Sequence, residues 1–341
     1  MQAAASAAVC VFDRPMIPLS VLDLATYPQG QGVAYAFETS RALAQAAEAW
    51  GYRRYWIAEH HNLEGVASSA TVVLMSHIAD HTKTIRVGSG GIMLPNHAPL
   101  VVAEQIGTLE SLHPGRIDLG LGRAPGTDPL TMRALRRGLA NEEFDDQVAE
   151  LMSYLAPEQP GQKLKAIPGA GIDVPIWILG SSTWSAHFAA AIGRPYSFAA
   201  HFAPGELMEA LAIYRREFKP SPQLDKPYVM VGIPALAAET DERAEFLATS
   251  MYQRFLGMVR NKRAPLPPPV EDIDKIWSPG ERYAVAERMA LMVVGGPERV
   301  AQNLRKVVEM TGADELIVAS DAYERKDRLR SYEILAEAAR A

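Results

Sequence analysis

The segment from Pro18 to Glu59 reads PLSVLDLATYPQGQGVAYAFETSRALAQAAEAWGYRRYWIAE, and its pattern changes twice along its length. Short apolar runs at Pro18–Asp23 and Arg54–Glu59 predict two strands. Between them, apolar residues recur at helical spacing from Val33 to Trp50, and Gly51 follows where a helix C-terminal cap belongs. A strand, a helix and a second strand in this order predict a βαβ unit with parallel strands.

The same alternation continues along the chain, and eight such repeats favour a closed barrel over an open sheet. An open sheet normally carries a glycine-rich nucleotide fingerprint after its first strand, whereas this chain has Asp23-Leu24-Ala25-Thr26-Tyr27 there. We therefore expect an α/β fold, a (β/α)8 TIM barrel, as a single domain over residues 17–341 behind a tail of residues 1–16. The eight expected strands are Pro18–Asp23, Arg54–Glu59, Ile85–Leu94, Arg116–Leu121, Pro175–Gly180, Tyr196–His201, Tyr228–Ala235 and Glu315–Ser320.

Two segments exceed what a minimal barrel needs, one after the fourth strand and one after the seventh. Residues 141–173 combine a predicted helix, Phe144–Leu155, with a loop rich in proline and glycine. Residues 261–280 contain several prolines, which prevent a helix, together with the apolar side chains of Ile273, Ile276 and Trp277. A lid over the barrel is one interpretation of this second segment, and a variable surface loop is the other.

Composition narrows the class of protein. Of 341 residues, 48% are hydrophobic and 22% are charged, which is typical of a folded globular chain. The net charge of −6 comes without a basic cluster, so we expect no nucleic-acid partner. The chain contains no run of about 18 apolar residues, so we expect no membrane span. The single cysteine, Cys10, lies in the tail and cannot form an intramolecular disulfide, which fits the cytoplasm.

Polar residues follow the second strand at Glu59, His60 and His61. In a parallel barrel the chemistry lies at the carboxyl ends of the strands, and imidazole exchanges protons near neutral pH. These three residues are therefore candidate catalytic groups, with hydrogen-bonded structural histidines as the alternative. His77 and His81 stand four residues apart, but Ile78 occupies the place where a metalloprotease needs glutamate, and we expect no metal site.

Three further strand ends carry residues suited to a phosphate-bearing cofactor. Glycines after the third strand indicate a bulge or the close approach of a ligand, although a tight barrel corner would explain them equally well. An arginine follows the fourth strand, and its guanidinium is suited to bind a phosphate. A helix N-terminus rich in hydroxyl groups follows the fifth strand and is suited to bind an anion, with a simple helix cap as the alternative. The candidate cofactor-binding residues are Ser89, Gly90, Gly91, Arg123, Gly180, Ser181, Ser182 and Ser185.

Taken together, these motifs resemble the bacterial luciferase-like flavin monooxygenases, in order as well as in spacing. The resemblance covers the chain from about Ile17 onward. It rests on Trp56–His61, Gly88–His97, Gly115–Gly126, Ile176–Ser182 and Val293–Glu298.

The resemblance implies a homodimeric TIM barrel that takes reduced FMN from a separate NAD(P)H:flavin reductase. It implies a non-prolyl cis peptide at Gly90–Gly91 and a phosphate site at Arg123, Ser181, Ser182 and Ser185. It also assigns His60 to proton management of a C4a-peroxyflavin.

The chain departs from the luciferases at Gly122, where they carry a reactive cysteine, and at Ala200, where they carry tryptophan. It therefore resembles the non-luminescent single-subunit members, and His201 and Phe202 are expected to shape the substrate pocket. The expected activity is insertion of one oxygen atom of O2 into a small, mostly apolar organic substrate. The alternatives are an F420-dependent oxidoreductase of the same superfamily and a flavin-binding protein without catalysis.

Overall fold

Eight parallel strands close into a barrel in the computed structural model, which describes residues 18–124, 126–135 and 143–340. The strand order runs β10, β1, β2, β3, β5, β6, β7 and β8, and β8 pairs back with β10. The predicted TIM barrel is thereby confirmed, while Cys10 and the rest of the predicted tail lie outside the described residues. The strands are β1 (Leu19–Asp23), β2 (Arg54–Ile57), β3 (Arg86–Ser89), β4 (Ile92–Met93), β5 (Ile117–Gly122), β6 (Ile176–Gly180), β7 (Tyr196–Phe198), β8 (Val229–Ala237), β9 (Val293–Gly295) and β10 (Glu315–Ala319).

The third predicted strand is not continuous. It divides into β3 and β4 on either side of Gly90–Gly91, whose peptide bond is cis, as the family resemblance implied. Both parts pair with β5, so the strand continues on the same neighbour after the break. A further strand, β9, was not predicted as one, and it extends the wall beside the end of β8.

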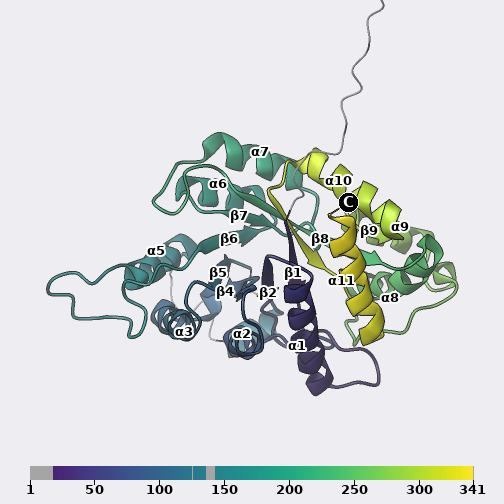
Figure 1. The fold of residues 1–341 in the computed structure, drawn as a ribbon, viewed down its shortest axis with the longest axis horizontal. Helices are drawn as coiled ribbons and strands as arrows, with labels where there is room; N and C mark the ends of the chain where they lie inside the picture. The colour runs from purple at the N-terminus through teal and green to yellow at the C-terminus, as the bar shows by residue number, and fades with distance from the viewer. Residues whose placement is uncertain (1–17, 125, 136–142, 341) are drawn as a thin grey trace, which may run out of the picture.

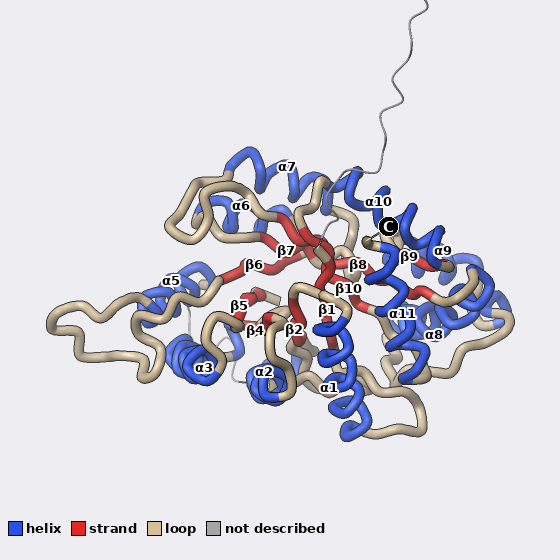
Figure 2. The backbone as a smooth tube through the Cα atoms, viewed as in Figure 1, coloured by secondary structure: helices blue, strands red, loops and turns tan. Residues whose placement is uncertain are grey.

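Helices surround the strands as an outer layer (Figures 1 and 2). The first begins at Val33 and ends at Ala49, and Gly51 follows with φ +81°, as its pattern predicted. The remaining elements are α2 (Thr71–Asp80), α3 (Pro99–Leu112), α4 (Pro129–Ala134), α5 (Phe144–Leu155), α6 (Thr183–Ala191), α7 (Leu207–Glu217), α8 (Asp241–Val259), α9 (Pro279–Arg288), α10 (Pro297–Thr311) and α11 (Arg325–Ala338), with the short 3-10 turns η1 (Leu94–Asn96) and η2 (Ile273–Lys275).

Alternation along the strands separates two apolar layers. On β2, Tyr55 and Ile57 pack outward in the large cluster shared with the helices, while Trp56 packs inside the barrel. Trp56 meets Trp177 edge to face inside the barrel, with ring centroids 5.1 Å apart. A Cβ at Gly88 would come within 2.5 Å of the Trp56 indole, so glycine leaves the room that this ring needs. The interior is a packed core and not a pore.

Charged side chains fill the end of the barrel at which the strands begin, opposite the carboxyl ends that carry the candidate site residues. The buried guanidinium of Arg54 lies 2.7 Å from Asp118 and 3.0 Å from Glu315. Arg86 also contacts Asp118, and Tyr228 donates to Glu315. Because these charges are paired with one another, we assign this end of the barrel a structural role. The candidate active site lies at the other end, where the strands end.

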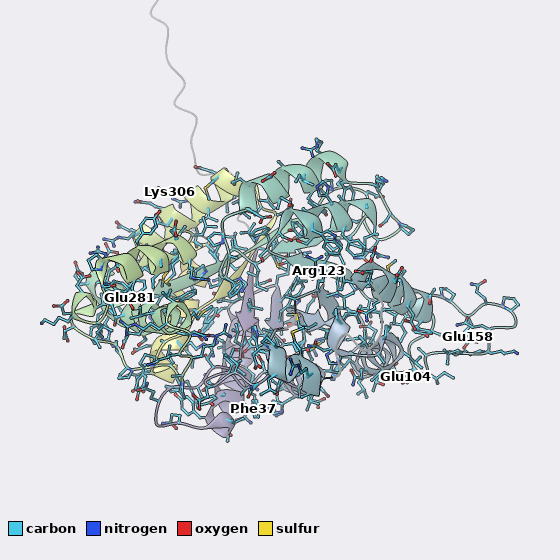
Figure 3. The ribbon with its side chains drawn as sticks, turned by 180° about the vertical axis from the view of Figure 1, so that it is seen from behind. Phe37, Glu104, Arg123, Glu158, Glu281 and Lys306 are labelled. Atoms are coloured by element: carbon cyan, nitrogen blue, oxygen red, sulfur yellow. The ribbon has the colours of Figure 1, made fainter. Side chains whose placement is uncertain are left out.

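The two predicted insertions take different courses. After β5, the loop between α5 and β6 projects from the side of the barrel, and Figure 3 shows Glu158 on it, far from the centrally placed Arg123. After β8, the chain forms α8, the segment 261–280 and α9 beside the barrel. No helix in the described ranges is long and apolar enough to cross a bilayer. Within the same residues, no group of three or more metal-ligating side chains assembles.

Candidate active site at the carboxyl end of the barrel

Strand alternation turns two adjacent candidate residues to opposite sides. Trp56 and Ala58 belong to the interior cluster, whereas Ile57 belongs to the layer beneath the helices. Continuing this alternation places Glu59 outward, toward α2 and α3, and His60 inward at the mouth of the barrel. The sequence motif that joins them therefore serves two locations.

Glu59 is buried and accepts hydrogen bonds from several donors. His61 Nε2 and His97 Nε2 each lie 2.9 Å from its carboxylate, and Asn96 Nδ2 and the Met93 amide each lie 3.0 Å from it. Burial raises the pKa of Glu59, but His97 and the other donors hold it below its usual value. Glu59 is thus a carboxylate that ties β2 to the chain after β4, and His61 is one of its partners.

A narrow cleft of about 130 Å³ runs beside this carboxylate on the outer side of the barrel. Glu59 and His97 line it together with residues of α2 and α3, among them Val73 and Val102. Glu59 therefore borders the helical layer and not the barrel mouth, which distinguishes its surroundings from those of His60.

His60 presents a neutral imidazole to the mouth. Its Nδ1 lies 3.3 Å from the carbonyl oxygen of Gly126, which can only accept, so Nδ1 carries the proton. Burial lowers the pKa of His60 to about 4, and the nearby positive charges of Arg254 and Arg263 lower it further against the opposing hydrogen bond to Gly126. The remaining ring nitrogen, Nε2, is an unprotonated acceptor at neutral pH.

His201 has the opposite arrangement. Its Nδ1 is buried and has no hydrogen-bond partner among the described residues, and a Cβ at Gly232 would lie 2.5 Å from this atom. A buried N–H without an acceptor is costlier than a buried lone pair, which places the proton on Nε2. Burial lowers the pKa of His201 to about 4, with smaller contributions from His60 and Arg254. The mouth thus holds one imidazole acceptor and one imidazole donor.

Arg254, itself part of an ion pair, supplies positive charge that lowers the pKa of both rings. Arg254 extends from α8 and contacts Asp321, which follows β10. The same carboxylate accepts a hydrogen bond from Thr26 and lies 3.8 Å from Arg328. The sequence does not predict this network, because none of its members lies within the motifs.

Glycines leave the wall between β3 and β5 without side chains. A Cβ at Gly91 would lie 2.8 Å from the carbonyl oxygen of Gly120, and one at Gly90 would lie 2.6 Å from the Leu22 side chain. Ser89 has its hydroxyl engaged on both sides, donating to the Gly120 oxygen at 2.8 Å and accepting from the Gly120 amide at 2.9 Å. Glycine at these two positions therefore allows close packing against Leu22 and the Gly120 backbone, and the Ser89 side chain stabilises the barrel. Gly90 is partly exposed, whereas Gly91 is buried.

The predicted phosphate residues gather around the first turn of α6. The Arg123 guanidinium stacks 3.9 Å from the centroid of the Trp184 ring, which brings the loop after β5 to this helix. Ser181 and Ser182 are partly exposed there. One feature opposes a phosphate, because the exposed carboxylate of Glu206 accepts a hydrogen bond from the Thr183 amide at 2.8 Å. An anion at this helix terminus would compete with Glu206.

Ser185 and Gly180 are less available to a cofactor than predicted, whereas Phe202 is available to a substrate. The Ser185 hydroxyl is buried, donates to the Ser182 oxygen at 2.7 Å and contacts the Tyr196 hydroxyl at 2.9 Å. Gly180 accommodates that hydroxyl, since a Cβ there would lie 2.1 Å from it. Phe202 is 45% exposed beside His201, where an apolar substrate could contact it.

The segment 261–280 is anchored at both ends. Leu266 donates its amide to the Tyr27 oxygen at 3.1 Å and accepts from the Gln29 amide at 2.9 Å, which places it beside the loop after β1. Trp277 packs near Tyr252 of α8, with ring centroids 5.9 Å apart. Ile276 and Trp277 thus pack on the apolar cluster that includes residues of α8, and the role of the segment as a lid stays a prediction.

Comparison with known proteins agrees with this architecture. Residues 18–315 match the luciferase-like monooxygenase family. The uncharacterised Bacillus subtilis protein YvbT is 57% identical over 94% of this chain and 96% of its own length. A luciferase-like monooxygenase of Escherichia coli K12 is 48% identical over 93% of this chain and 96% of its own. The crystal structure of apo-MsnO8 superposes with a TM-score of 0.87 at 36% identity, covering 94% of this chain and 98% of that one.

Two more distant structures share the fold alone. An FMN complex of the oxygenating constituent of 3,6-diketocamphane monooxygenase, from Pseudomonas putida, has a TM-score of 0.70 at 18% identity, with coverage of 95% and 97%. An F420-dependent secondary alcohol dehydrogenase has a TM-score of 0.69 at 14% identity, with coverage of 95% and 99%. The fold by itself therefore accommodates either cofactor.

Proposed function

The chain belongs to the luciferase-like monooxygenase family and is an oxygenase of that family, and from this premise we propose that it uses reduced FMN and O2 to oxygenate a small, mostly apolar organic substrate. The observation that carries the proposal is the pair of buried imidazoles at one barrel mouth: His60 Nδ1 lies 3.3 Å from a carbonyl oxygen, whereas His201 Nδ1 has no partner among the described residues. Such a pair offers one proton acceptor and one hydrogen-bond donor at the same mouth.

The residues at the mouth are compatible with FMN. Gly90 is partly exposed and could meet a planar ring through its backbone, and Arg123, Ser181 and Ser182 would hold the phosphate in competition with Glu206. In the overall reaction the O–O bond breaks, one oxygen atom enters the substrate, the other leaves as water, and reduced FMN supplies the two electrons.

The chain's own residues manage protons and position one another. His60 accepts a proton at Nε2, held in that tautomer by Gly126. His201 donates a hydrogen bond from Nε2 toward the oxygen that leaves as water, and keeps its proton. Glu59 acts as a positioning residue, because it holds His61 and His97 and touches the outer layer. We assign His61 to the same task and Phe202 to the substrate pocket.

Two partners complete the proposal. An oxygenase without a dinucleotide fingerprint needs a separate NAD(P)H:flavin reductase to deliver reduced FMN. A homodimer is supported by the adjacent helices α2 and α3, which expose apolar side chains to solvent: Val73 is 69% exposed, Leu112 is 63% exposed and Val101 is 45% exposed.

The test measures oxygen consumption and product in a single turnover with chemically reduced FMN and a panel of apolar organic substrates. We expect the wild type to couple the two, and His60→Ala to retain flavin affinity while turning over about a hundredfold to ten-thousandfold more slowly. His81→Ala, which removes an exposed imidazole directly after α2, is the matched control and should turn over like the wild type.

Three results would contradict the proposal. A chain that binds reduced FMN but consumes no oxygen with any substrate is a flavin carrier. Hydride transfer from reduced F420 without oxygen consumption indicates the oxidoreductase alternative. Normal turnover by His60→Ala returns this residue to a structural role.

A further inference from the structure

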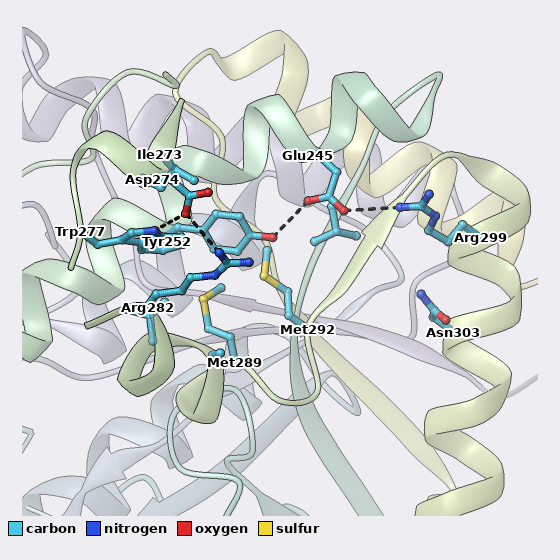
Figure 4. A pocket seen from close by; sticks show the side chains of 13 residues that line it. Glu245, Tyr252, Ile273, Asp274, Trp277, Arg282, Met289, Met292, Arg299 and Asn303 are labelled. Atoms are coloured by element: carbon cyan, nitrogen blue, oxygen red, sulfur yellow. Dashed lines mark hydrogen bonds and ion pairs between the residues drawn. The ribbon is translucent and has the colours of Figure 1, made fainter. Parts of the chain in front are cut away.

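We propose that the insertion after β8 builds a second ligand site, for a small neutral apolar molecule, outside the barrel. A cavity of about 550 Å³ opens between α8, η2, α9, β9 and α10 (Figure 4). That volume falls within the range of small-molecule sites in proteins. The proposed oxygenase function does not depend on this site, so either can fail without the other.

Helix α8 separates the cavity from the barrel mouth. Glu245 and Tyr252 stand seven residues apart on α8, two turns along one face, and both line the cavity. Arg254 lies two residues further on and projects from the opposite side of the helix, where it contacts Asp321 at the mouth. A ligand in this cavity would therefore not occupy the flavin or substrate position.

The floor and one wall of the cavity are apolar. Val285, Met289 and Val294 are buried members of a second hydrophobic cluster, distinct from the main core. Trp277 and Tyr252 form an aromatic wall, with rings inclined by 43°. The flexible thioether of Met289 can adjust to ligands of different outline, as methionine does in other adaptable sites.

The rim carries charge of both signs in matched pairs (Figure 4). Arg282 lies 3.4 Å from Asp274, and Arg299 lies 3.4 Å from Glu245. Tyr252 also donates to Glu245 at 3.3 Å, and burial raises the pKa of this phenol, so it stays neutral. No single sign dominates the entrance, so nothing selects an anion or a cation.

These features define the class of ligand. An apolar body buries the floor and packs against the aromatic wall, which contributes roughly 25 cal/mol for each Å² removed from water. A charged group would lose hydration on entering the apolar floor without a fixed counter-charge there. The amide of Asn303 lines the same cavity and can serve one polar group of the ligand as donor or acceptor.

The test uses two fluorescent probes that share one skeleton, neutral N-phenyl-1-naphthylamine and its anionic counterpart 1-anilinonaphthalene-8-sulfonate. We expect the neutral probe to bind the FMN-loaded protein one to one, and at least tenfold more tightly than the sulfonate. Ala286→Trp fills the cavity from α9 and should weaken binding of the neutral probe at least tenfold.

Glu287→Trp adds the same side chain to the exposed face of α9, outside the cavity lining, and should bind the neutral probe like the wild type. Thermal unfolding of both variants establishes that they fold. Equal affinity of Ala286→Trp and wild type for the neutral probe would overturn the proposal. Binding of the sulfonate as tight as that of the neutral probe would refute the ligand class.

Discussion

His60 and His201 show how burial tunes a residue that is titratable near neutral pH. The Nδ1 atom of His60 contacts a carbonyl oxygen, and that of His201 is buried beside Gly232 of β8, which leaves the two Nε2 atoms for chemistry. Neutrality matters here, because two imidazolium ions in one mouth would repel each other and Arg254.

The stability of the protein should depend on these two residues in acid. The pKa of each is about 4, against 6.5 for an ordinary histidine, so the unfolded chain binds more protons between these values. The free energy of unfolding should therefore fall as pH drops from about 6.5 to 4. Above pH 6.5 these two groups should not make the free energy of unfolding depend on pH. His201→Gln should flatten the slope in urea titrations at several pH values.

Gln302→Ala is the control for that measurement, because it alters an exposed position on α10 and removes no titratable group. It should leave the slope unchanged. If His201→Gln keeps the full acid dependence of the wild type, burial of this ring does not disfavour its charged form.

Two substitutions test the phosphate site, one that removes the positive charge of Arg123 and one that removes the negative charge of Glu206. Arg123→Ala should weaken FMN binding about tenfold to a hundredfold, because one charge-assisted contact is lost, and leave riboflavin binding unchanged. Glu206→Gln should strengthen FMN binding, since a carboxylate no longer competes for the Thr183 amide. Fluorescence titration measures both. Arg305→Ala on the exposed face of α10 is the control, and equal affinities of the wild type and Arg123→Ala for FMN would exclude the site.

At the scale of elements, the chain after β8 does most to distinguish this barrel from a minimal one. It adds α8, which carries Arg254 toward the mouth and Tyr252 toward the outer cavity. It also adds the segment 261–280, whose backbone is attached to the loop after β1 through Leu266. One insertion thus contributes to two separate surfaces.

Leu266→Pro should loosen this segment, because proline cannot donate the hydrogen bond to Tyr27. A lid limits the access of water to the reaction, so we expect faster tryptic cleavage at Lys262 and Arg263, and more hydrogen peroxide released for each substrate oxidised. Leu266→Ala keeps both backbone hydrogen bonds and serves as the control. An unchanged peroxide-to-product ratio in Leu266→Pro would identify the segment as a structural loop.

At the scale of the whole molecule, the exposed apolar residues on α2 and α3 predict assembly. Val73→Lys combined with Val101→Lys should convert a dimer to monomers, because two buried charges would meet their symmetry mates. Light scattering after size-exclusion chromatography measures the mass. Met310→Lys on α10, at the other end of the molecule, is the control. Retention of the dimer by the double variant would locate the interface elsewhere.

Much of the architecture could be predicted from local patterns, because strand and helix periods are recorded in neighbouring residues. The eight barrel strands and the helix from Val33 follow from such periods. The cis peptide at Gly90–Gly91 came from family resemblance, whereas the division of the third strand into β3 and β4 was not predicted. Strand β9 was missed because its three residues, with glycine last, make no pattern of their own.

The sequence by itself determined the barrel fold, the candidate residues at the ends of its strands and the family. Only the tertiary structure decided which of those residues share a site. Glu59 meets His97 across 38 residues, and Arg254 meets Asp321 across 67, because closing the barrel brings distant strand ends together. The alternation that sends Glu59 outward and His60 inward acquires its meaning once the barrel has an inside. Contacts between distant segments depend on how all the elements pack at once, and no local pattern encodes them.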